Sequence, residues 1–72
     1  DSGSTVTIFN LENDQTIVYK IVGEDESDIE NGLLSYKSPL SRAMIGKSNG
    51  DLVELNTLET SQSFQITDIS YD

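Results

Sequence analysis

Apolar and polar residues alternate in two stretches near the start of the chain, residues 5–11 and 16–22, as they do in half-buried β-strands. The polar run 12–15, with the sequence ENDQ, separates them and is typical of a tight turn. The pattern therefore predicts a β-hairpin. The apolar residues expected to share a face are Val6 with Ile8 in the first strand, and Ile17 with Tyr19 and Ile21 in the second.

The last predicted strand, residues 63–71, contains a break in its apolar alternation. The spacing changes from two to three between Ile66 and Ile69. In an unbroken strand this change turns Ile69 to the opposite face of the sheet. An extra residue in a β-bulge restores the phase, and we predict one near Thr67 and Asp68.

A short helix is predicted to begin after Ser38. Serine is a good N-cap, and Pro39 at the first helical position gives up a donor that the helix does not use. Gly46 suits the left-handed conformation that follows many helix ends. A helix of about two turns is unstable alone in water, so its apolar stripe must pack on the sheet. That stripe consists of Leu40, Ala43 and Met44.

The remaining apolar segments complete an α+β domain. Residues 33–36 form a short extended piece, and residues 52–56 form a strand with Val53 and Leu55 on one face. Residues 57–62 are expected to be a loop. We therefore predict a mostly antiparallel sheet of about five strands packed on one short helix.

The charge of the chain narrows the choice of partner. Its 72 residues include 13 Asp and Glu against 4 Lys and Arg, for a net charge of −9, and no Cys or His. Such a chain repels nucleic acids and anionic membranes, and it lacks thiolate ligands and the commonest acid–base catalyst. No apolar run approaches the roughly 18 residues of a membrane span, and no signal peptide is visible. We expect a cytoplasmic domain whose partner is a protein.

Two charged segments are candidates for function. Five acids lie between residues 24 and 30, a density that predicts an exposed loop. The EF-hand spacing is absent, which favours a solvated or partner-facing loop over a metal site, and no feature supports a carboxylate-pair or Ser–Lys hydrolase. Lys37, Arg42 and Lys47 follow. They either solubilise the chain or complete a two-signed surface that orients a protein partner, and composition favours neither reading.

The order of motifs along nearly the whole chain resembles the C-terminal domain of the bacterial GreA and GreB transcript-cleavage factors. The matching motifs are Y-x-I-V-G at residues 19–23, the acidic run G-E-D-E-S-D that follows, S-x-x-S-P at residues 35–39, A-M-I-G-K at 43–47 and G-D-L-V-E-L-N-T at 50–57. Their order and spacing together are more specific than any one of them.

The resemblance implies an FKBP-like fold and docking on RNA polymerase, at the rim of the secondary channel. In this family a separate N-terminal coiled coil enters the channel, and acids at its tip help to hold the catalytic Mg²⁺ of the polymerase. The present chain contains no heptad segment. It therefore corresponds to a single docking domain over residues 1–72, which would contact the coiled coil in a parent protein and would itself have no enzymatic activity and no cofactor.

The family's docking motifs fall on residues 24–28 and 35–39. Position 37 departs from the family, which often has a polar or acidic residue there, so that Lys37 would weaken or retune docking. Gre-like polymerase inhibitors and Rnk-type regulators share the fold and remain alternatives; the absence of Trp counts against an FKBP-like prolyl isomerase. With the cations of the basic segment included, the residues expected to contact polymerase are Glu24, Asp25, Glu26, Asp28, Ser35, Lys37, Ser38, Pro39 and Arg42.

Overall fold

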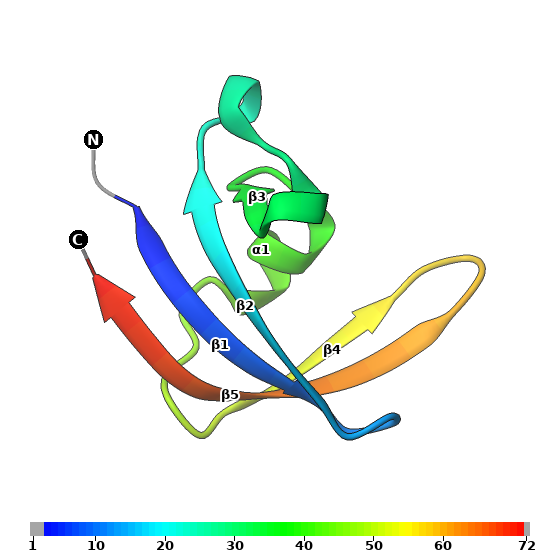
Figure 1. Ribbon diagram of the computed structural model, residues 1–72. Coiled ribbons are helices and arrows are strands. Elements are labelled where there is room, and N and C mark those ends of the chain that lie inside the picture. The colour runs from blue at the N-terminus through cyan, green and yellow to red at the C-terminus, as the bar shows by residue number, and fades with distance from the viewer. Residues whose placement is uncertain (1–2, 72) are drawn as a thin grey trace.

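The computed structural model describes residues 3–71. Five strands form one sheet in the order β3-β2-β1-β5-β4, and one short helix packs on it, as the alternation predicts (Figure 1). The fold is therefore α+β. In chain order the elements are β1 (Ser4–Asn10), β2 (Gln15–Val22), the 3₁₀ turns η1 (Glu24–Glu26) and η2 (Ile29–Asn31), β3 (Leu33–Ser35), α1 (Pro39–Met44), β4 (Leu52–Asn56) and β5 (Ser61–Tyr71).

Two hairpins, the antiparallel β1–β5 pair that joins them, and one parallel pair build the sheet. Strands β1 and β2 form the predicted antiparallel hairpin, and Ile8 lies opposite Ile17. Strand β3 pairs in parallel with β2, which makes it the one parallel neighbour within the described chain. Strand β5 begins at Ser61, so the loop predicted for residues 57–62 is too long by two residues. The hydrogen bond from Thr57 N to Thr60 O, at 2.8 Å, closes the connection to β4 in four residues.

The predicted β-bulge is confirmed on strand β5. Thr7 pairs with Asp68 and Ile8 with Ile66, so Thr67 is the extra residue between them. The Thr67 hydroxyl donates to the Thr7 carbonyl at 3.2 Å. Ile69 thereby returns to the inner face, where it packs against the core. The extra residue Thr67 thus keeps the apolar side chains on both sides of the bulge on the inner face of this eleven-residue strand.

The helix has the ends that its sequence predicts. Ser38 caps it by accepting a hydrogen bond from Ser41 N–H at 3.2 Å, Pro39 opens the first turn, and Gly46 adopts a φ of 81° beyond the end. Its stripe faces the sheet, with Met44 buried.

The core is small and lies on the concave side of the sheet. Figure 1 shows the sheet curled around α1, while the β4–β5 hairpin extends away from the body. The helix covers only part of the concave face, which leaves apolar side chains accessible beside it. No helix within residues 3–71 is long and apolar enough to cross a membrane. The buried apolar residues are Val6, Ile8, Leu34, Met44, Val53, Phe64 and Ile66.

Candidate protein-binding face

The parallel pairing of β3 with β2 brings the two sequence-predicted motifs together. Val22, at the end of β2, pairs with Ser35, and the Tyr36 N–H donates to the Val22 carbonyl at 2.9 Å. Because the two strands are parallel, the chain leaves the sheet at the same edge in both places, once toward the acidic segment, residues 24–30, and once toward the Ser35–Pro39 corner. The two segments therefore form one continuous surface at this end of the molecule.

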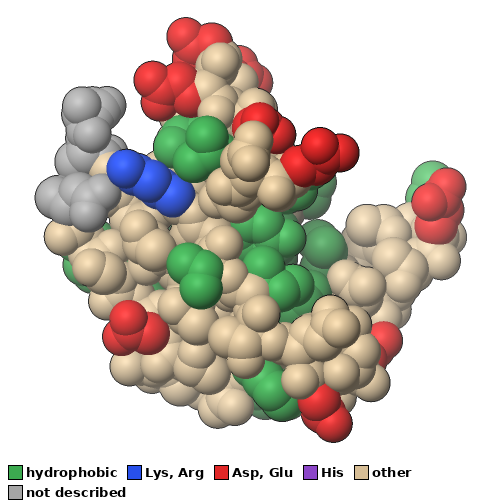
Figure 2. Space-filling view, in the orientation of Figure 1, with side chains coloured by type: hydrophobic (Ala, Val, Ile, Leu, Met, Phe, Trp, Pro, Cys, Tyr) green, Lys and Arg blue, Asp and Glu red, His purple; other side chains and the backbone are tan. Residues whose placement is uncertain are grey.

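The acidic segment is ordered by its own hydrogen bonds. In η1 the Ser27 hydroxyl donates to the Glu24 carbonyl at 3.1 Å. In η2 the Asn31 amide donates to Asp28 Oδ2 at 2.7 Å, and Gly32 ends the turn with a φ of 78°. The exposed loop predicted for this segment thus contains two 3₁₀ turns. Figure 2 shows their carboxylates gathered at one end of the molecule, where they are exposed to solvent.

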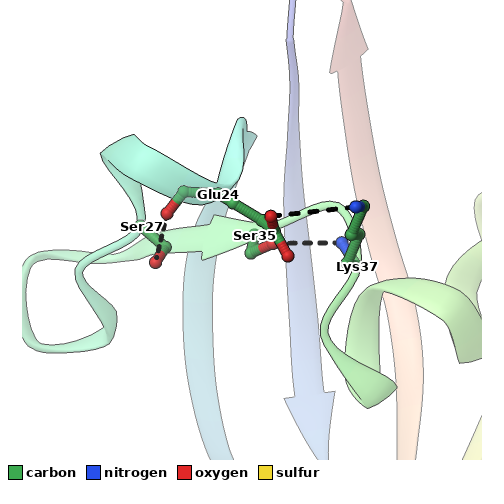
Figure 3. A network of polar contacts seen from close by, with 4 residues as sticks. All are labelled: Glu24, Ser27, Ser35 and Lys37. Carbon is green, nitrogen blue, oxygen red and sulfur yellow. Dashed lines mark hydrogen bonds and ion pairs between the residues drawn. The ribbon is translucent and has the colours of Figure 1, made fainter.

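Lys37 joins the acidic segment to the corner (Figure 3). Its Nζ lies 3.7 Å from Glu24 Oε1, and its backbone N–H donates to Ser35 Oγ at 3.1 Å. Both charged side chains are more than half exposed, at 57% and 62%. An exposed pair of this kind contributes at most about 1 kcal/mol to stability. The pair therefore contributes more to the charge pattern of the surface than to the stability of the fold.

A buried serine, Ser41, fixes the shape of the Ser35–Pro39 corner. Its hydroxyl donates to the Ser35 carbonyl at 2.7 Å and accepts from the Ser38 hydroxyl at 3.0 Å. Ser41 is only 4% exposed, whereas Pro39 is exposed beside it. The hydrogen bonds of Ser41 thus fix the corner in a conformation that exposes Pro39 and leaves Ser35 and Ser38 half-buried. Sequence reasoning missed Ser41; the signal was a second serine three residues after the N-cap.

An open apolar groove of about 430 Å³ begins at this corner. Leu34 and Phe64 lie among its floor residues, Pro39 and Ile29 line one side, and Leu55 lines the side of the β4–β5 hairpin. Figure 2 shows the hollow with apolar side chains inside it, between the body and the extended hairpin. Sequence reasoning did not predict this groove, because its walls come from elements distant in the chain.

The other two cations of the basic segment, Arg42 and Lys47, form no ion pair with an acid within residues 3–71. Arg42 is exposed on α1. Lys47 lines a second groove, of about 270 Å³, together with Met44 and Ile45. Of the three basic residues in the predicted two-signed surface, the structure pairs Lys37 alone with an acid. Within residues 3–71 no group of three or more acidic side chains is placed to hold a metal ion.

Sequence comparison relates the chain to bacterial elongation factors. The family described as transcription elongation factor GreA/GreB, C-term, matches residues 1–71. The chain is 51% identical to the transcription elongation factor GreA of a Jannaschia species, 46% to that of Cereibacter sphaeroides and 44% to that of Pseudomonas aeruginosa, in each case over 69 residues. Each match covers 96% of this chain and 44% of the relative, so the chain spans less than half the length of these proteins.

Solved structures agree on the fold. Thermus aquaticus Gfh1 superposes with a TM-score of 0.80 at 23% identity, over 94% of this chain and 45% of that one. The Nitrosomonas europaea elongation factor GreA/GreB gives a TM-score of 0.74 at 20% identity, over 94% and 57%. These similarities confirm the α+β, FKBP-like architecture that the motifs imply.

Proposed function

Since the chain belongs to the GreA/GreB family of transcription elongation factors, whose C-terminal domain it matches, we propose that it docks on RNA polymerase. The surface that docks is the acidic segment together with the Ser35–Pro39 corner, and the polymerase site is the rim of the secondary channel. The predicted contacts are therefore the residues on this surface, with Arg42 at its border. The domain has no catalytic role of its own.

One observation carries this proposal above the others. The two family motifs are separated in sequence, yet the β2–β3 pairing and the Lys37–Glu24 contact place them side by side and exposed. Exposed, ordered backbone with a fixed charge pattern suits recognition of a protein surface. A motif whose purpose was only to fold the domain would have most of its side chains in the core.

The docking role extends to the rest of the parent protein. In this proposal the domain positions an N-terminal coiled coil at the polymerase channel and contacts it within the same chain. The location is then the bacterial cytoplasm, where the polymerase works. The parent acts either as a cleavage factor or as an inhibitor of the same enzyme, according to the residues at the tip of that coiled coil.

Neutralising two acids of the segment is expected to weaken binding to polymerase. The double variant Asp25→Asn with Glu26→Gln removes two exposed charges whose side chains hold no turn together, unlike Asp28. Each exposed charge is worth about 0.2–1 kcal/mol, so the loss of two charges lowers the binding constant at low salt by roughly twofold to thirtyfold. Biolayer interferometry against core RNA polymerase measures the loss, which shrinks as salt rises.

The matched control removes the same charge elsewhere. Glu12→Gln with Asp68→Asn changes two exposed carboxylates, one in the β1–β2 turn and one on β5, outside the proposed face. This variant is expected to bind like the unchanged chain. Equal losses in the two double variants would assign the effect to net charge alone and would contradict the proposed face.

A further inference from the structure

The chain contains two Asn-Gly pairs, at residues 31–32 and 49–50, and both asparagines are exposed in turns. Asparagine before glycine is prone to deamidation, because glycine has no Cβ to hinder attack by its own backbone nitrogen on the asparagine side chain. In that reaction the glycine N–H loses its proton, its nitrogen bonds to the asparagine Cγ, and ammonia leaves. Water then opens the cyclic imide at either carbonyl and gives aspartate or isoaspartate. The reaction therefore needs no reagent besides water.

Hydrogen bonds protect the first pair on both of its reacting groups. Asn31 Nδ2 donates to Asp28 Oδ2 at 2.7 Å, and the Gly32 N–H donates to the Ile29 carbonyl at 3.1 Å. The Asp28 carboxylate fixes the side-chain amide in place, and it pushes electron density toward the amide carbonyl, so that Cγ is a poorer electrophile. Both hydrogen bonds must open before Asn31 reacts.

The second pair is held on one reacting group only. The Asn49 side chain forms no hydrogen bond within residues 3–71, because the Asp51 carboxylate accepts from the Ser48 N–H instead, at 2.9 Å. The Gly50 N–H donates to the Ile66 carbonyl at 2.6 Å, just beyond the last residues that pair in the β4–β5 ladder. The ends of a ladder open more readily than its centre. When this one bond opens, the Gly50 nitrogen is free to attack the Asn49 side chain.

We propose that Asn49 is the residue that deamidates in the folded chain, at a rate set by opening of the Gly50–Ile66 hydrogen bond, and that isoaspartate at this position detaches the turn from β5. Ile66 bonds to the turn twice, since its own N–H donates to the Asp51 carbonyl at 2.9 Å. Isoaspartate adds a carbon atom to the main chain before Gly50, which moves the turn out of register with Ile66. The Ile66 side chain is 1% exposed, so the loss of these bonds loosens the core.

Peptide mapping compares the two pairs within one molecule. Trypsin separates them into peptides 21–37 and 48–72. The chain is incubated in mildly alkaline buffer, either folded or in concentrated urea, and deamidation of each peptide is followed by mass spectrometry. In the folded chain Asn49 is expected to react about tenfold faster than Asn31 or more, because Asn31 must also break a hydrogen bond to a carboxylate. In urea, where no turn remains, the two rates should be similar.

Two variants test the assignment. Asn49→Gln keeps the side-chain amide but requires a larger ring, so it should abolish the reaction of the second pair. Asp28→Ala frees the Asn31 side chain and should raise the rate at Asn31 toward that at Asn49. The proposal is overturned by a folded chain in which Asn31 reacts as fast as Asn49, or in which Asn49 stays intact while the chain in urea is converted. Unchanged protection of Asn31 in Asp28→Ala would also overturn it.

The structural consequence is tested by comparing the isoaspartate product with Asn49→Asp, which adds the same charge without lengthening the main chain. The isoaspartate chain, separated by chromatography, should melt at a lower temperature than the unchanged chain. Asn49→Asp should melt like the unchanged chain, because the Asn49 side chain has no hydrogen bond to lose within residues 3–71. Equal melting temperatures of the isoaspartate chain and Asn49→Asp would contradict the proposed detachment of the turn.

Discussion

Ile8→Ala is expected to lower the free energy of unfolding by about 2–5 kcal/mol, the largest effect of any single change considered for this chain. Ile8 is 0% exposed and lies in the central strand of the sheet, opposite Ile17 on one side and Ile66 on the other. The change removes buried methylene and methyl groups, and the flanking strands cannot close the space without breaking their pairing. Both the lost burial and the remaining cavity destabilise the fold.

The small size of the domain makes this loss severe. At roughly 0.05–0.15 kcal/mol per residue, a domain of 72 residues has a total stability of about 4–11 kcal/mol. Urea unfolding followed by circular dichroism should show a much lower midpoint for Ile8→Ala with little change in slope. Val18→Ala, at a position in the adjacent strand that is 54% exposed, is the control and should change the stability by less than about 1 kcal/mol. Comparable losses in both variants would mean that the core is not where the structure places it.

Ser41→Ala is expected to cost about 1–3 kcal/mol and to weaken docking as well. The change removes the hydrogen bond that the Ser35 carbonyl accepts from Ser41 and the one that the Ser38 hydroxyl donates to it. The Ser35 carbonyl keeps the bond from Ser38 N–H at 3.0 Å, and Ser38 Oγ keeps the bond from Ser41 N–H. Each of the two lost hydrogen bonds contributes about 0.5–1.5 kcal/mol, which together give the expected loss of stability. The corner that carries Pro39 then loses its fixed conformation, although Pro39 itself is unchanged.

The Ser41→Ala variant is tested by measuring both its stability and its affinity for polymerase. Urea unfolding gives the lost stability, and interferometry against polymerase at a temperature where the variant stays folded gives the lost affinity. Ser70→Ala, an exposed serine on β5, should change neither quantity. A Ser41→Ala variant that is destabilised yet binds polymerase normally would show that the corner does not need its ordered shape for recognition.

Local patterns in the sequence predicted much of the fold. Alternation identified the hairpin, and the three-residue step between Ile66 and Ile69 located the bulge, because a strand has a strict period of two. The helix ends were also predictable, since Ser38, Pro39 and Gly46 act through backbone geometry within one turn. These features depend on neighbours in the chain and so leave a readable signal.

The features that sequence reasoning missed depend on contacts between distant residues. The apolar groove arises because the β4–β5 hairpin extends past a helix of only six residues. No local sequence pattern indicates that the helix leaves this part of the sheet uncovered. Ser41 looked like an ordinary helical serine, and its link to the Ser35 carbonyl needs the parallel β2–β3 pairing to exist first. The start of β5 was placed two residues late because Ser61 and Gln62 have no apolar alternation to mark them.

Competition with a full-length GreA for core RNA polymerase tests the central claim most directly. The purified chain, immobilised for interferometry, is expected to bind polymerase with a Kd of about tens of micromolar or tighter, and full-length GreA should displace the polymerase from it. The chain alone should then block GreA-stimulated cleavage of RNA without stimulating cleavage itself. An absence of binding at about tens of micromolar, or binding that GreA does not reduce, would contradict a docking face built from the acidic segment and the Ser35–Pro39 corner.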